Sequence, residues 1–87
     1  MKRNLKALFF YAYWDGSYNE RNEFVDECKA LGVPFDIIDV ETEEGFKLSE
    51  KHNIKMCPRV VFLKNGKEIG RENGKSAYMK IENYINR

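Results

Sequence analysis

The sequence predicts an α/β protein in which a four-stranded mixed sheet is flanked by three helices, in the order β-α-β-α-β-β-α. Short apolar runs, typical of buried strands, alternate with segments whose apolar residues recur every three or four positions, as on one face of a helix. An Asn65-Gly66 pair between the last two apolar runs is typical of a tight hairpin. A parallel crossover followed by this hairpin makes the sheet mixed.

The first strand is expected over about residues 5 to 13. Its centre, residues 7 to 11, is continuously apolar. A run without polar alternation is typical of a strand that is buried on both faces, so helices should cover it above and below.

The first helix is expected to begin at Ser17, because Ser17 and Glu20 have the spacing of a capping box. Its inward stripe is formed by apolar residues three or four positions apart: Phe24, Val25, Cys28 and Leu31. Gly32 and Pro34 supply the stop signal, so the helix should end near Leu31.

The second strand is expected over Pro34 to Val40, which is largely apolar. Thr42, with Glu43 and Glu44 after it, can open a second, shorter helix. That helix carries Phe46, Leu48 and His52. An irregular link is expected from Asn53 to Pro58.

The last two strands are expected at Arg59 to Leu63 and at Lys67 to Arg71, antiparallel around Lys64-Asn65-Gly66. Ser76, which follows Gly74, can cap a last helix. Four apolar or aromatic residues fall on one face of that helix: Tyr78, Ile81, Tyr84 and Ile85.

Composition predicts one domain over residues 1–87, because 43% hydrophobic and 14% aromatic residues suffice for a single core. Fifteen Lys and Arg are interleaved with fourteen Asp and Glu, which argues against nucleic acid as the main partner. No run approaches the ~20 apolar residues of a membrane-spanning helix, so no membrane partner is expected. Cys28 and Cys57 have neither disulfide-framework nor metal-ligand spacing. We therefore expect no metal, no cofactor and a cytoplasmic location.

Four local sequences together point to one family. They are Tyr11-Ala12-Tyr13-Trp14, Glu50-Lys51-His52-Asn53-Ile54 ahead of Cys57-Pro58, Phe62-Leu63-Lys64-Asn65-Gly66-Lys67, and Gly74. In this order and spacing the chain resembles a minimal thioredoxin from about Lys6 to Ile85. It lacks the extra N-terminal strand and helix of full-length thioredoxins. The resemblance implies the thioredoxin-like fold.

The resemblance also implies a shallow groove that binds an extended peptide. Trp14 matches the tryptophan before the family's active turn, and Pro58 matches its cis-proline, which implies a cis bond between Cys57 and Pro58. Gly74 matches the loop glycine that lets a bound peptide approach. The implied peptide- or protein-binding residues are Trp14, Gly16, Ser17, Tyr18, Cys57, Pro58, Arg59 and Gly74.

The active turn departs from the family pattern in both of its thiols. Asp15 and Tyr18 occupy the positions of the nucleophilic and the resolving cysteine. Other departures are Ser17 for the proline between them, Phe9 for a buried proton-transferring carboxylate, Glu23 for a helix-kinking proline and Arg59 for a threonine. Dithiol exchange needs a thiolate, a second thiol within bonding distance and a base. Dithiol reductase activity is therefore not expected.

Several of these residues have a structural interpretation beside the functional one. Asp15 is either a helix-start residue at the positive end of the helix dipole or a ligand or acid. Tyr18 is either a packing residue or a partner contact. Cys28, on the apolar stripe, is expected in the core, and His52 is expected to be a packing or surface residue.

Two functions of different class follow. The first is a redox-inactive module that binds a peptide or protein partner in the groove around Trp14 and Pro58. The alternative is a monothiol disulfide oxidoreductase with Cys57 as the catalytic nucleophile and glutathione or a partner thiol as the resolving group. The alternative needs a reactive thiolate, which Arg59 would favour and Asp15 would oppose.

Overall fold

The sheet of the computed structural model, which describes residues 4–12, 14 and 18–86 and of Tyr18 the backbone alone, has the strand order β2-β1-β3-β4. β1 (Leu5–Tyr11) pairs in parallel with β2 (Phe35–Asp39) and antiparallel with β3 (Arg59–Lys64). β4 (Lys67–Asn73) lies antiparallel beside β3. The order of elements and the mixed sheet are those predicted.

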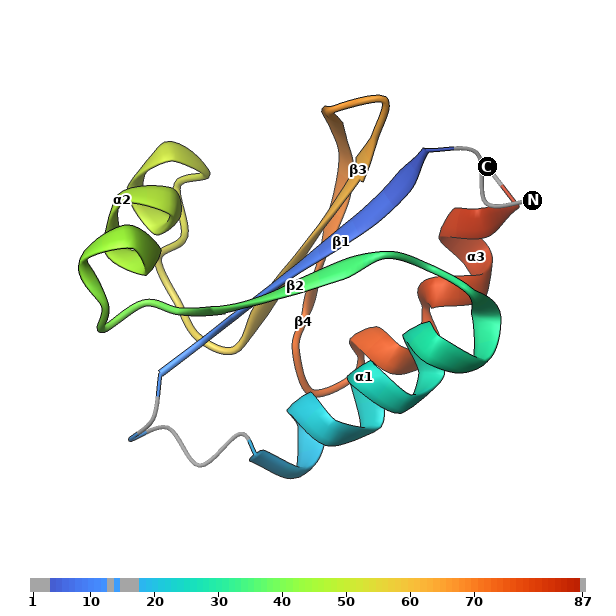
Figure 1. Cartoon of the computed structure of the whole chain (residues 1–87), viewed down its shortest axis with the longest axis horizontal. Helices are drawn as coiled ribbons and strands as arrows, with labels where there is room; N and C mark the ends of the chain where they lie inside the picture. The colour runs from blue at the N-terminus through green and yellow to red at the C-terminus, as the bar shows by residue number, and fades with distance from the viewer. Residues whose placement is uncertain (1–3, 13, 15–17, 87) are drawn as a thin grey trace.

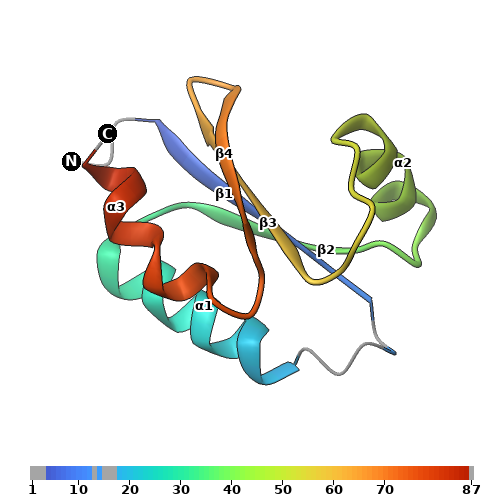
Figure 2. The same cartoon turned by 180° about the vertical axis from the view of Figure 1, so that it is seen from behind.

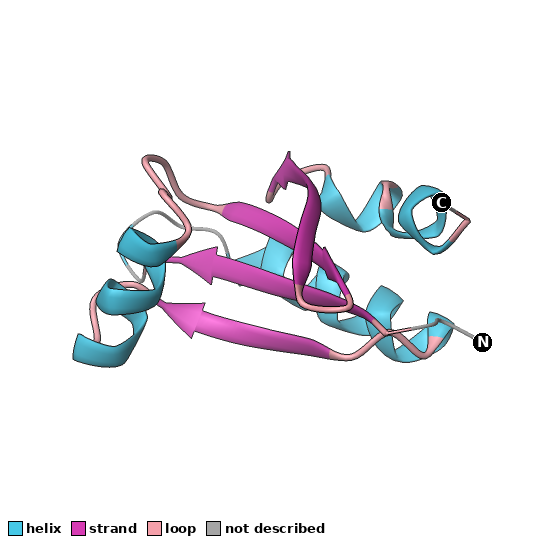
Figure 3. Ribbon diagram, turned by 90° about the horizontal axis from the view of Figure 1, so that it is seen from above, coloured by secondary structure: helices cyan, strands magenta, loops and turns pink. Residues whose placement is uncertain are grey.

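β1 is an inner strand that is buried on both faces, as its continuous apolar run predicts. Ala7 and Phe9 point into one core cluster, and Leu8 and Phe10 point into a second. α1 (Tyr18–Leu31) and α3 (Ile81–Ile85) cover the first face, and α2 (Glu43–Lys51) lies on the other (Figures 1 and 2). Figure 3 places α2 beside the end of the sheet at which the two parallel strands finish.

The face under α1 holds the larger core. Phe24 of α1 lies between two aromatic rings of the sheet, 5.2 Å from the centroid of Phe9 and 6.3 Å from that of Phe62. Phe62 stacks at 3.9 Å on Tyr84 of α3. Phe9, at the position where the family has a carboxylate, is fully buried in this aromatic column.

Element boundaries differ from the predicted ones mainly at strand ends. β1 stops at Tyr11 and not at residue 13, and Tyr13 lies outside the described residues. β2 is one residue shorter than expected at each end, whereas β4 continues to Asn73 because it keeps pairing with Arg59 at the start of β3. α1 ends at Leu31 as predicted.

The last helix is not the continuous helix that Ser76 was expected to cap. A 3-10 turn, η2 (Ala77–Met79), comes first and α3 begins only at Ile81. The Ser76 hydroxyl makes no capping hydrogen bond and instead donates to the Asn73 carbonyl at 3.4 Å. Apolar residues spaced three apart share a face in both helix types, so the pattern predicted the buried face correctly and the helix type wrongly.

Candidate functional site

Two loops meet at the end of the sheet where β3 begins and β4 ends. The Cys57–Pro58 peptide bond is cis, and the Gly74 N–H donates a hydrogen bond to the Pro58 carbonyl at 3.0 Å. A Cβ at Gly74 would lie 2.5 Å from the Pro58 Cβ. Only glycine allows the two loops to approach this closely.

Part of the predicted site lies outside the described residues. This applies to Asp15, Gly16 and Ser17, and Tyr18 is described only as the first backbone position of α1. The capping role of Ser17, the helix-start role of Asp15 and the ring position of Tyr18 therefore stay predictions.

A groove of about 440 Å³ runs along the described part of this end of the molecule. It is lined by Trp14, Val40, Phe46, Ser49, Ile54, Lys55, Met56 and Cys57. Three of its large apolar side chains are open to solvent: Trp14 is 73% exposed, Phe46 54% and Met56 63%. Apolar side chains gathered this way around a concavity are typical of binding surfaces.

Phe46 and Met56 are site residues that the sequence reasoning missed. Each is a single exposed apolar residue in a polar segment, so neither carries a periodic signal. The available clue for Met56 was its place directly before Cys57-Pro58. For Phe46 it was a bulky aromatic residue between Gly45 and Lys47 on a short, largely polar helix.

α2, which carries Phe46, is fixed at its start by close contacts with the end of β2. The Thr42 hydroxyl accepts a hydrogen bond from the Gly45 N–H at 2.9 Å and donates one to the Asp39 carbonyl at 2.8 Å. A Cβ at Gly45 would overlap the Asp39 carbonyl, so glycine is required at this contact. The predicted start of this helix at Thr42 is confirmed.

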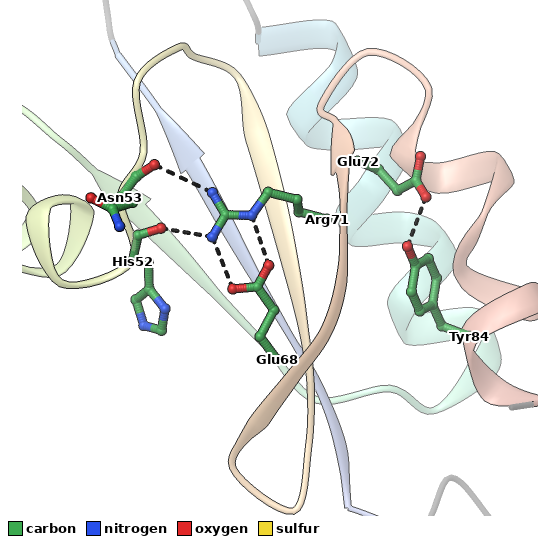
Figure 4. A network of polar contacts seen from close by, with 6 residues as sticks. All are labelled: His52, Asn53, Glu68, Arg71, Glu72 and Tyr84. Carbon is green, nitrogen blue, oxygen red and sulfur yellow. Dashed lines mark hydrogen bonds and ion pairs between the residues drawn. The ribbon is translucent and has the colours of Figure 1, made fainter.

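The other end of α2 is held by Arg71 of β4 (Figure 4). Its guanidinium donates to the backbone carbonyls of His52 at 2.7 Å and Asn53 at 3.3 Å. The same group forms a bidentate pair with Glu68, at 2.7 and 2.8 Å. We call this set of contacts the Arg71 clasp. It ties the C-terminal end of the helix to the edge strand of the sheet.

The pKa values of the residues in and beside the Arg71 clasp are shifted. The hydrogen bonds from Arg71 lower the pKa of Glu68 below its usual value, and the same pairing raises that of Arg71. Burial and then the charge of Lys51 lower the pKa of His52, whose ring lies 5.9 Å from that of Phe10. His52 is thus a packing residue, as expected from the sequence.

The two cysteines lie in different environments, and neither forms a disulfide. Cys28 of α1 is fully buried in the core, and burial raises its pKa to about 12, so it stays a thiol in the folded protein. Its predicted core position is confirmed. Cys57 is half-buried and lines the groove.

Arg59, directly after Pro58, points to the same face of the sheet as Val61, toward α2. Its closest polar contact is with sulfur: Nη2 lies 3.8 Å from the Met56 Sδ. Lys55 lines the groove next to it. Among the described residues no group of three or more His, Cys, Asp or Glu could hold a metal ion, and no described helix is long and apolar enough to cross a membrane.

Comparison with solved structures relates the whole chain to one set of proteins. A thioredoxin from Fasciola hepatica is 30% identical, with 99% of this chain and 82% of that chain aligned and a TM-score of 0.82. The thioredoxin pre-protein of Schistosoma mansoni is 28% identical over 98% of this chain and 79% of that chain, with a TM-score of 0.71. Mitochondrial thioredoxin 3 from Saccharomyces cerevisiae has the same fold at 22% identity, with 94% and 80% coverage and a TM-score of 0.78. No family profile and no curated protein sequence match.

Proposed function

Because this chain belongs to the thioredoxin-like family, we propose that it is a redox-inactive member that binds a peptide or protein segment in its groove. The observation that carries this proposal is the set of three exposed apolar side chains, Trp14, Phe46 and Met56, around a groove that borders the Pro58 loop. Exposed tryptophan in particular is enriched among residues that dominate binding energy. The segment bound would be extended, as the resemblance to thioredoxins implies for this groove.

The positions of the two cysteines support the proposal that the protein is redox-inactive. Dithiol exchange needs two thiols within bonding distance, and this chain has one buried in the core and one on the groove. Asp15 and Tyr18, which match the family's two cysteines, have no thiol chemistry. Phe9 offers no proton at the position of the family's buried carboxylate.

Two assays test the proposal together. In an insulin-turbidity assay with dithiothreitol, the protein should not accelerate precipitation above the dithiothreitol rate. Immobilised protein should retain cysteine-free peptides, with retention lost in Trp14→Ala and weakened in Met56→Ala. Met79→Ala is the matched control, since Met79 is 61% exposed but does not line the groove. Catalysed insulin reduction, or retention that Trp14→Ala leaves unchanged, would contradict the proposal.

The alternative is monothiol chemistry at Cys57, which the position of this thiol on the groove favours. Glutathione or a partner thiol would then resolve a mixed disulfide. Iodoacetamide labelling against pH separates the two functions, with buried Cys28 as the internal control. A Cys57 labelling midpoint at or above the ~8.5 of a free thiol excludes the alternative, and a midpoint well below that value supports it over simple binding.

A further inference from the structure

Positive charge lies along one bank of the groove. Lys55, in the segment that joins α2 to β3, lines the groove, and Arg59, the first residue of β3, contacts the groove residue Met56. In the part of the chain that the structure describes, neither cation forms an ion pair or donates a hydrogen bond to a carboxylate. The nearby Arg71 differs, because Glu68 neutralises it.

The exposed face of α2 around Phe46 carries negative charge. Glu43 and Glu50 of α2 stand three residues before and four residues after Phe46, so they flank its ring on the exposed side of the helix. The groove lining itself is mostly apolar. The groove residue Phe46 is therefore flanked by carboxylates, whereas the groove residue Met56 is flanked by the cations Lys55 and Arg59.

We propose that the partner segment carries a large apolar side chain followed or preceded, on one side only, by acidic residues. The apolar side chain packs among Trp14, Phe46 and Met56, and the carboxylates reach Arg59 and Lys55. Acidic residues on the other side of the anchor would face Glu43 and Glu50, which repel them. This inference rests on the proposed function and adds to it the chemistry of the partner.

Trp14 is the single tryptophan of the chain and lines the groove, so its fluorescence reports binding directly. Three blocked peptides serve as probes: acetyl-Ala-Leu-Phe-Glu-Glu-Ala-amide, acetyl-Ala-Glu-Glu-Leu-Phe-Ala-amide and the neutral acetyl-Ala-Leu-Phe-Gln-Gln-Ala-amide. One of the two acidic orders should bind about two- to five-fold more tightly than the neutral peptide at low ionic strength. The advantage should shrink as salt is added.

Charge variants assign the effect to the basic bank. Arg59→Gln should bring the favoured acidic peptide to the affinity of the neutral one, and Lys55→Gln should reduce the advantage. Arg59→Glu should favour a peptide with two lysines in place of the two glutamates. Lys67→Gln removes the same charge at the far hairpin, where Lys67 is exposed, and should leave the acidic advantage intact.

The outcomes distinguish this inference from the proposed function. Equal affinities for all three peptides, or an acidic advantage that survives Arg59→Gln, overturn the inference while peptide binding stands. A Trp14 emission maximum that shifts with protein concentration before any peptide is added shows a second copy in the groove and also overturns the inference. No response to any of the peptides overturns both.

Discussion

The Arg71 clasp allows a quantitative test of what holds α2 against the sheet. Arg71→Met removes the guanidinium but keeps most of the apolar stem, so it isolates the polar contacts. Glu68→Gln removes only the ion pair, and Arg71→Lys keeps the charge but loses the planar fork. These three variants separate the carboxylate contacts of Arg71 from its carbonyl contacts.

The expected magnitudes follow from the exposure of each contact. The side chains of Arg71 and Glu68 are about one-third exposed, at 32% and 34%, so their ion pair contributes about 0.5 kcal/mol. The 2.7 Å bond to the His52 carbonyl is partly buried and charged, worth about 1.5 kcal/mol, and the longer bond to Asn53 adds little. Arg71→Met should therefore cost about 2 kcal/mol and lower Tm by about 10 °C. Glu68→Gln should cost about 0.5 kcal/mol.

Urea unfolding followed by circular dichroism measures these differences. Hydrogen exchange should also show that the α2 amides open more readily in Arg71→Met, while those of β1 lose protection only by the global change in stability. If Glu68→Gln costs as much as Arg71→Met, the carbonyl contacts of Arg71 depend on Glu68 to hold the guanidinium in place, and the two contributions do not add as assumed. If Arg71→Met costs less than about 0.5 kcal/mol, the clasp does not anchor α2 at all.

Three further predictions concern other parts of the structure. Gly74→Ala places a methyl group 2.5 Å from the Pro58 Cβ and should cost about 1–3 kcal/mol in urea unfolding; an unchanged midpoint would mean that the loops separate freely. The lowered pKa of folded His52 means that the unfolded state takes up its proton first, so stability should fall as pH drops through 6.5, and His52→Gln should flatten this slope. The raised pKa of folded Cys28 has the opposite sign: stability is retained below pH 9.0 and lost toward pH 12, a loss that Cys28→Ala should remove. Mass spectrometry after iodoacetamide treatment at pH 9.0 should find native Cys28 unmodified, and rapid labelling would contradict its burial.

The fold was predictable because its strongest signals are local. A continuous apolar run is enough to place β1 in the middle of the sheet, and an Asn-Gly pair is enough to join β3 and β4, whose turn has positive φ at both Asn65 and Gly66. The missed features depend on distant partners. Arg71 reads as an ordinary exposed strand residue until its contacts 18 and 19 positions away are known. The apolar residues on either side of the break before α3 have the same spacing as in a continuous helix.

The candidate site was predictable in part for the same reason. Pro58 and Gly74 could be located through the resemblance, and the structure places them in direct contact. The α2 side of the groove could not be predicted, because Phe46 lines the groove only when α2 is docked against the sheet. The hydrophobic pattern of a sequence indicates which residues are buried. A binding surface consists of apolar residues that stay exposed, so the pattern does not reveal it.

The attachment of α2 to the sheet links the stability of the fold to peptide binding. This helix is nine residues long, and its only apolar side chain packed against the core cluster beneath it is the partly buried Leu48. The Thr42 cap and the Arg71 clasp therefore carry much of its attachment, and the Phe46 side of the groove moves with it. Trp14→Ala should weaken peptide binding without changing the urea midpoint, because Trp14 is exposed. Arg71→Met should weaken both, although Arg71 does not line the groove. A binding loss in Arg71→Met that disappears at low temperature, where α2 stays docked, would locate the effect in helix docking and not in the groove itself.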